Sequence, residues 1–234
     1  MASVRQDITL KEYQNFVKEV YGLSNDRYFS NWDMITNMER FIMRGLKGIR
    51  KGDREKTRVN ILIALSWFMS IMNQLHIDLE DEVWKRFPYL CSYCAFCPCR
   101  CREKKIETRQ RVPIDESKRP KTLEDFQKML EKIYPSESRT LEHAGVHMAE
   151  EAGEFSESIM FFRGGHNDED FENVKSEVAD LFTHFLGVFS SLNMSMAKEL
   201  SLVFMMELIG WRCNDYTKRF VIRCFGRCYC RCYC

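Results

Sequence analysis

Two short segments concentrate carboxylates beside apolar residues. The first, HMAEEAGEF (residues 147–155), and the second, EVADLF (177–182), contain Glu150, Glu151, Glu154, Glu177 and Asp180. Positions three apart share one face of a helix, so each segment offers an i, i+3 pair. Two such helices packed antiparallel would gather four carboxylates, which repel one another unless a cation lies between them.

A hard divalent cation, Mg²⁺ or Mn²⁺, suits this chemistry because it prefers oxygen ligands and keeps positions for water and phosphates. The same ion activates water and neutralises charge at phosphorus, which predicts phosphoanhydride hydrolysis. His147 and His184 border the carboxylates as ligands or hydrogen-bond donors, and the oxygen-rich surroundings argue against zinc there. The alternative is that both motifs lie on ordinary solvated helices.

The elements that must position these residues read as helices. Apolar residues recur at spacings of three and four, while glycine and proline fall mainly between segments. We expect helices in the second half near 122–133, 141–163, 169–193 and 195–219, so that four helices form a bundle. The predicted fold class is all-α.

The chain also contains an internal repeat. TLKEYQNFVKEVY (9–21) matches TLEDFQKMLEKIY (122–134) at an offset of 113, and four extra residues after Gly165 raise the offset to 117. We therefore predict two tandem units, 1–101 and 121–234, each ending in a cysteine-rich tail. The polar, proline-bearing segment 102–120 reads as a linker.

EEAGE (150–154), followed after about two dozen residues by EVADLF, resembles the all-α nucleoside triphosphate pyrophosphohydrolase superfamily, which includes MazG-like enzymes and dimeric dUTPases. The resemblance implies Mg²⁺-dependent cleavage of a nucleoside triphosphate substrate into a monophosphate and pyrophosphate. It also implies metal ligation by Glu151, Glu154, Glu177 and Asp180, with Glu150 as a water-orienting base.

The first copy lacks this site. Its aligned positions hold Met38, Phe41, Asn60 and Ile63, which are three apolar residues and one amide. Because members of the resembled family pair subunits around each site, the chain is expected to be a fused pseudo-dimer with a degenerate N-terminal half and a catalytic C-terminal half. Further oligomerisation is left open.

One departure concerns the family's phosphate-binding residues. MazG-like chains carry a lysine and then an asparagine on the next helix, but LVFMM (202–206) has neither. At the position of copy one that aligns with this lysine of the family, the chain has Lys85. We expect Lys85 to bind substrate phosphate across the pseudo-dimer, the alternative being an exposed surface lysine.

Both copies end in closely spaced cysteines, CSYCAFCPCRC (91–101) and CFGRCYCRCYC (224–234). Such thiolates suit tetrahedral zinc, while an iron–sulfur cluster and free thiols are the alternatives. We expect a zinc site shared between the tails that takes Cys91 and Cys94 with two cysteines from the second tail. The candidate ligands are Cys91, Cys94, Cys97, Cys99, Cys224, Cys228, Cys230 and Cys232.

Composition sets the remaining expectations. The 234 residues are 45% hydrophobic. The 35 basic residues nearly balance the 34 acidic ones, so the overall charge does not indicate binding to nucleic acid or to a membrane. The N-terminus lacks an apolar signal core, which favours a cytoplasmic protein with reduced thiols. The basic, tyrosine-bearing second tail motivates the alternative function, a zinc-stapled module that binds nucleotides or, less favoured, nucleic acid without cleavage.

Overall fold

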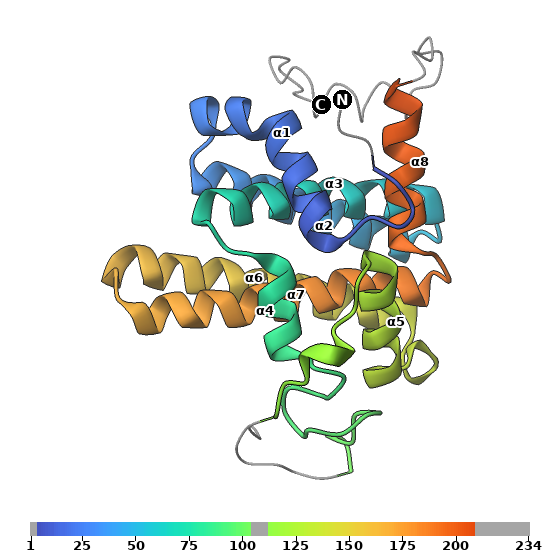
Figure 1. Cartoon of the computed structure of the whole chain (residues 1–234). Coiled ribbons are helices and arrows are strands. Elements are labelled where there is room, and N and C mark those ends of the chain that lie inside the picture. The colour runs from blue at the N-terminus through green and yellow to red at the C-terminus, as the bar shows by residue number, and fades with distance from the viewer. Residues whose placement is uncertain (1–3, 104–111, 209–234) are drawn as a thin grey trace.

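The computed structural model describes residues 4–103 and 112–208, and every regular element within these ranges is helical (Figure 1). The α-helices are α1 (Leu10–Tyr28), α2 (Asn31–Arg50), α3 (Arg54–Leu75), α4 (Leu79–Arg86), α5 (Leu123–Ile133), α6 (Leu141–Gly165), α7 (Asp168–Ser191) and α8 (Met196–Leu208). Two 3₁₀ turns lie at Glu116–Lys118 and Ser136–Ser138. The predicted all-α class is confirmed.

Polar caps fix where the carboxylate-bearing helices begin. The Thr140 hydroxyl accepts from the backbone N–H of His143 at the start of α6, and the Asn167 side chain accepts from Asp170 N–H at the start of α7. α6 ends at Gly165, and the next residue, His166, caps it in a left-handed conformation (φ 50°). The predicted ranges for these two helices therefore agree with the structure to within about two residues at each end.

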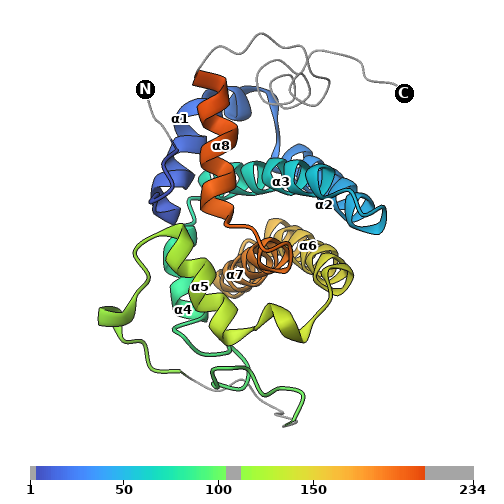
Figure 2. The same cartoon turned by 90° about the vertical axis from the view of Figure 1, so that its right-hand side faces the viewer.

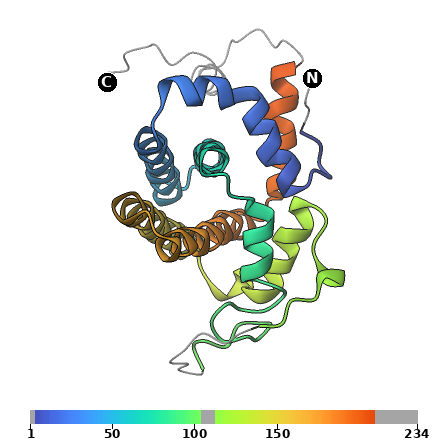
Figure 3. The same ribbon diagram turned by 60° about the vertical axis from the view of Figure 1, so that its left-hand side comes forward.

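Two helical hairpins form the centre of the molecule. α2 packs antiparallel to α3, α6 packs antiparallel to α7, and α2 lies against α6. Figure 3 shows α3 nearly end-on, with α2 on one side and the α6–α7 pair below it. α4 crosses α7, while α8 stands beside α1 with the Phe204 ring 4.7 Å from that of Phe16 (Figure 2). Helices from one copy thus cover helices from the other.

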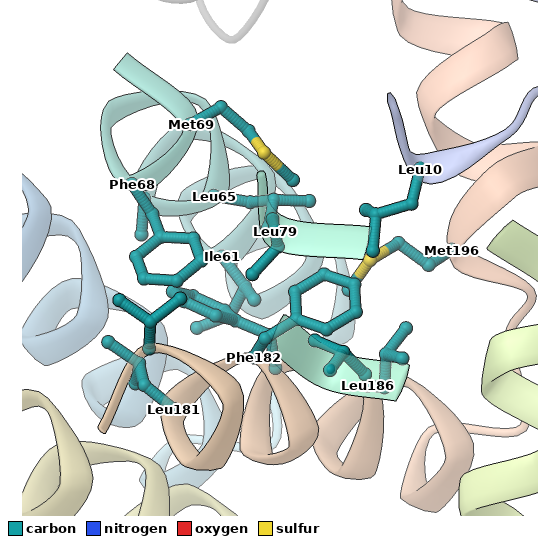
Figure 4. Close-up of a cluster of buried hydrophobic side chains, with 14 of the residues drawn as sticks. Leu10, Ile61, Leu65, Phe68, Met69, Leu79, Leu181, Phe182, Leu186 and Met196 are labelled. Carbon is teal, nitrogen blue, oxygen red and sulfur yellow. The ribbon is translucent and has the colours of Figure 1, made fainter. Parts of the chain in front are cut away.

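The two copies share one hydrophobic core. Phe182 and Leu186 of α7 face Ile61 and Phe68 of α3, and Leu79 of α4 lies between them (Figure 4). These side chains are almost fully buried, and removing their apolar surface from water is the main stabilisation of such a fold. The two repeats therefore pack around a single shared core and do not form two separate cores.

The same hydrogen bonds recur at equivalent positions of the two copies. The Gln14 amide donates to the Ile77 carbonyl at 2.8 Å and accepts from the Leu79 N–H at 3.2 Å. Gln127, 113 positions later, makes the equivalent two bonds, each 2.9 Å long, to residues 194 and 196, 117 positions after their counterparts. In each copy the first helix is thereby tied to the start of the last. These matched contacts support the interpretation of the sequence as a repeat.

Of the described helices, none is by itself long and apolar enough to cross a bilayer, although α3 and α4, which meet at 99°, reach that length and apolarity when taken together.

Candidate functional site

Three carboxylates meet where α6 packs on α7. Oxygens of Glu151, Glu177 and Asp180 lie within 4.8 Å of one another, and all three residues are half-buried. We call this group the acid cluster. The Oε2 atom of Glu151 is buried and has no hydrogen-bond partner among the described residues. An unsatisfied buried carboxylate oxygen beside two further carboxylates is a candidate position for a cation.

The other two predicted glutamates on α6 lie outside this group. Glu154 is exposed one turn further along the helix. Glu150 is also exposed, and its Oε2 atom lies 2.8 Å from Nδ1 of His147. Neighbouring helix positions point about 100° apart, so Glu150 cannot face α7 when Glu151 does. The structure therefore brings together three of the four predicted ligands and separates the predicted base from them.

A cation from the other copy already contacts the acid cluster. The Arg86 guanidinium, at the end of α4, donates to Asp180 from Nε at 3.1 Å and from Nη2 at 2.5 Å. Both side chains are largely buried, with exposed fractions of 14% and 16%. This two-bond geometry is typical of a strong arginine–carboxylate pair. No sequence motif pointed to Arg86.

Lys85, the predicted phosphate-binding residue, lies elsewhere. Its ammonium is 2.8 Å from Oε1 of Glu82, its side chain is 58% exposed, and it is not among the residues that line the cavity described below. Successive residues of α4 point in different directions, so Arg86 faces α7 while Lys85 faces solvent. Copy one thus brings Arg86, and not Lys85, to the carboxylates, and the contact of Lys85 with phosphate stays a prediction.

Burial and mutual repulsion set the proton affinity of the acid cluster. The pKa of Glu151 is raised to about 7 by burial first and then by the charges of Asp180, Glu154 and Glu177, against which Arg86 acts only weakly. His184 Nε2 lies 3.4 Å from Glu151 Oε1. Burial, reinforced by His147, lowers the pKa of His184 to about 4. His184 is therefore neutral near pH 7, while Glu151 is poised between its two forms.

A cavity of about 560 Å³ opens beside these residues. α6 and α7 contribute Glu151, Asp180 and His184 to its lining, and the loop after α4 contributes Arg100 and Arg102. Carboxylates and basic residues thus line the same space. Such a pairing suits a ligand that binds both a cation and anionic groups, as a metal-bound polyphosphate does.

A chain of histidines continues along the cavity. His147 and His143 both line it, and their Nε2 atoms are 2.9 Å apart. Because Nδ1 of His147 donates to Glu150, its Nε2 accepts from His143 when both rings are neutral. His143 was not predicted from the sequence, although its position four residues before His147 places it on the same helix face.

Copy one carries core residues at the positions that correspond to the carboxylates. Met38, Phe41 and Ile63 are buried, with no more than 3% exposure, and the Asn60 amide donates to the Lys56 carbonyl of its own helix at 2.6 Å. All four side chains are thus buried, and the replacement of a metal site by these residues stays a prediction. The helices therefore pack without carboxylates at these positions.

A second candidate ligand group lies in the first cysteine-rich tail. Sulfurs of Cys91, Cys94, Cys99 and Cys101 lie within 4.8 Å of one another, with 3.7 Å between Cys91 and Cys101 and 3.9 Å between Cys94 and Cys99. We call this group the four-cysteine cluster. Four thiols in this arrangement could hold a metal ion such as zinc.

The composition of the four-cysteine cluster differs from the expected ligand set. Cys97 is exposed and donates from Sγ to the Lys132 carbonyl at 3.4 Å, while Cys101 takes the fourth place. The predicted contribution of the second tail lies outside the described residues. That prediction named Cys224, Cys228, Cys230 and Cys232.

Comparisons of the chain with protein-family models, with curated proteins and with solved structures found no significant match.

Proposed function

We propose that the protein is a Mg²⁺-dependent pyrophosphohydrolase that converts nucleoside triphosphates into monophosphates and pyrophosphate. The observation that carries this proposal is the acid cluster, which lies at a cavity and includes a buried carboxylate oxygen without a partner among the described residues. Copy one packs the same helices with Met38, Asn60 and Ile63, none of them a carboxylate, at these positions. Because the fold does not need the carboxylates, chemistry is the better explanation for them. The sequence resemblance to all-α pyrophosphohydrolases points in the same direction.

In this proposal Glu151, Glu177 and Asp180 hold Mg²⁺ or Mn²⁺, which supplies charge neutralisation at phosphorus and a more acidic water. Glu154 joins this set by a change of rotamer, since its side chain is exposed one turn away. Arg86 keeps the Asp180 carboxylate oriented and offsets part of the negative charge at the site. Copy one thus supports a site whose carboxylates all come from copy two.

The neighbouring histidines orient the carboxylates in this account. His184 is neutral near pH 7 and lies beside Glu151, so its imidazole positions that carboxyl group, while its lowered pKa makes it a weak base. Glu150 acts through His147: by accepting from Nδ1, it holds that ring with Nε2 toward His143. Glu150 is therefore a positioning residue in this proposal and no longer the direct base that the resemblance implied.

The alternative is a module that binds nucleotides without cleaving them. The Arg86–Asp180 pair favours it, because a buried guanidinium already compensates part of the acid cluster without any metal. The two functions differ in a measurable way. Cleavage requires the carboxylates of the acid cluster to bind a divalent cation, whereas binding alone would tolerate replacing one of them with an amide.

The test measures pyrophosphate release from a mixture of ribonucleoside and deoxyribonucleoside triphosphates with Mg²⁺. Glu177→Gln keeps the side-chain shape but removes a ligand charge, so we expect turnover to fall at least about 100-fold while the protein stays folded. Glu157→Gln, which changes an exposed glutamate on α6, is the matched control and should retain parental activity. Full activity in folded Glu177→Gln protein would overturn the assignment.

A further inference from the structure

Two of the separations between sulfurs of the four-cysteine cluster match those around a tetrahedral zinc ion, and all of them are at most 4.8 Å. A Zn–S bond of about 2.3 Å places the sulfurs of a tetrathiolate about 3.8 Å apart, and the Cys91–Cys101 and Cys94–Cys99 pairs are 3.7 and 3.9 Å apart. A disulfide would need about 2 Å. All four sulfurs come from residues 91–101, so this ligand set is complete within the first tail.

Hydrogen-bond donors surround the same sulfurs. The backbone N–H groups of Tyr93 and Arg100 donate to Cys91 Sγ at 3.4 Å and to Cys94 Sγ at 3.3 Å. The Tyr134 hydroxyl donates to Cys91 Sγ at 3.3 Å. Donors of this kind stabilise thiolates and fix the direction of metal ligands. Donors from the loop and from the end of α5 are therefore already directed at two of the four sulfurs.

The loop that carries the cluster is attached to the end of α5. The Cys99 N–H donates to the Ile133 carbonyl at 2.8 Å, and Tyr134 directly after α5 contacts Cys91. Residues 87–102 contain neither helix nor strand, so few regular hydrogen bonds hold this stretch together. An irregular segment of this length inside a folded domain gains order from a bound metal.

The same loop forms one wall of the cavity. Pro98, Cys99, Arg100 and Arg102 line it together with Glu151 and Asp180 of the acid cluster, and the Arg100 guanidinium lies 5.2 Å from the centre of the Phe96 ring. Arg100 stands between two cysteines of the four-cysteine cluster. The position of this basic wall therefore depends on the arrangement of the four sulfurs.

We propose that a zinc ion bound by the four-cysteine cluster holds this loop as the basic wall of the cavity, where Arg100 and Arg102 contact the phosphates of a ligand whose metal is bound by the acid cluster. The contact with phosphate rests on the proposed function, whereas the zinc site and its control of the wall do not. Zinc has a structural role here, and the two arginines determine the preference for polyphosphate.

The zinc site is tested by metal content in the full chain. The parent, the variant Cys99→Ser and the matched control Cys97→Ser are each incubated with Zn²⁺ under reducing conditions and then desalted. The zinc content of each protein is measured. We expect Cys99→Ser to lose one zinc equivalent and Cys97→Ser to lose none. A third variant replaces every cysteine in 224–234 with serine and should keep one equivalent. Loss of all zinc in that third variant, retention in Cys99→Ser, or iron in place of zinc would overturn the proposal.

Control of the wall is tested by hydrogen exchange, which does not depend on activity. Amides of residues 91–101 and 130–134 should exchange at least tenfold faster after zinc is removed by chelation, and should recover when zinc is restored. Amides in the middle of α3 should not change, which shows that the fold is intact. Equal exchange with and without zinc would contradict the proposed coupling.

Calorimetric titration with inorganic triphosphate and Mg²⁺ tests the contact with phosphate. The double variant Arg100→Ala, Arg102→Ala should keep its zinc and bind at least tenfold more weakly, whereas Arg163→Ala on α6 should match the parent. Unchanged binding in the double variant would overturn the role of the two arginines, even if the parent hydrolyses nucleotides. Conversely, zinc-dependent triphosphate binding by a parent without hydrolytic activity would retain this inference and reject the proposed function.

Discussion

The guanidinium of Arg86 on α4 holds the carboxylate of Asp180 on α7 through two hydrogen bonds of 3.1 and 2.5 Å. α4 belongs to the first copy of the repeat and α7 to the second, so a residue of the first copy supports the acid cluster of the second. This contact gives the two copies a structural reason to remain packed together.

Arg86→Ala should destabilise the protein and impair the acid cluster. Removing one partner of a largely buried ion pair leaves Asp180 uncompensated, which costs about 2 to 4 kcal/mol of unfolding free energy. Lys85→Ala is the neighbouring control, and its exposed pair with Glu82 contributes less than about 1 kcal/mol. Urea denaturation and nucleotide kinetics measured on both variants make the comparison. Equal effects, or a larger loss of activity for Lys85→Ala, would return the phosphate-binding role to Lys85.

Truncations at the copy-one positions should act through stability alone. Phe41→Ala and Ile63→Ala remove buried side chains and should lower the unfolding free energy by about 2 to 5 kcal/mol. Activity per folded molecule should stay within about twofold of the parent, since neither residue belongs to the acid cluster. Thermal melting and active-site titration separate the two quantities. A specific loss of turnover in fully folded Ile63→Ala protein would show that copy one takes part in the chemistry.

Two glycines on α6 should respond oppositely to replacement by alanine. A Cβ atom at Gly145 would lie 2.5 Å from Ile49 Cδ1 on α2, whereas none of the described atoms lies within 4 Å of a Cβ at Gly153. Gly153→Ala should therefore stabilise the protein by about 0.5 to 1 kcal/mol through helix propensity. Gly145→Ala should be less stable than Gly153→Ala by about 1 to 3 kcal/mol because the α2–α6 contact must open. Equal melting temperatures for the two variants would contradict this close packing.

Glu151 and His184 give opposite contributions to the pH dependence of stability. The folded pKa of Glu151, about 7, lies above its ordinary 4.5, so stability is lost as the pH rises through that window. The folded pKa of His184, about 4, lies below its ordinary 6.5, so stability is lost as the pH falls through that window. The two effects largely cancel between pH 4.5 and 6.5.

Glu151→Gln isolates the glutamate contribution. Without added Mg²⁺, the stability of this variant relative to the parent should increase between pH 4.5 and 7 and then level off, by an amount on the order of 3 kcal/mol. Glu157→Gln should show no such trend because that side chain is exposed. Urea denaturation at several pH values gives the difference. A pH-independent difference for Glu151→Gln would show that the proton affinity of Glu151 is not raised.

The sequence predicted those parts of the fold and site that depend on local pattern. Apolar spacing and the placement of glycine and proline predicted the bounds of α6 and α7 to within about two residues, and the i, i+3 carboxylates predicted the three members of the acid cluster. Arg86 was missed because its role depends on how α4 is rotated against α7, and no motif encodes that rotation.

The ligand set of the cysteine loop could not be predicted from the sequence either. Alternate residues in CPCRC are cysteines, so spacing alone does not say whether Cys97 or Cys101 completes a set with Cys91 and Cys94. That choice depends on how the loop folds against the end of α5, where the Cys97 sulfur meets the Lys132 carbonyl instead. The tertiary contact decides the ligand, and it is not visible in a single sequence.

The most direct test of the central claim is the identity of the products that the parent protein releases from a purified nucleoside triphosphate. Anion-exchange separation of the reaction should show monophosphate and pyrophosphate in equal amounts, formed with Mg²⁺ and abolished when Mg²⁺ is withheld. Release of diphosphate and inorganic phosphate, or intact triphosphate after prolonged incubation of folded, zinc-loaded protein with Mg²⁺, would contradict the proposed pyrophosphohydrolase.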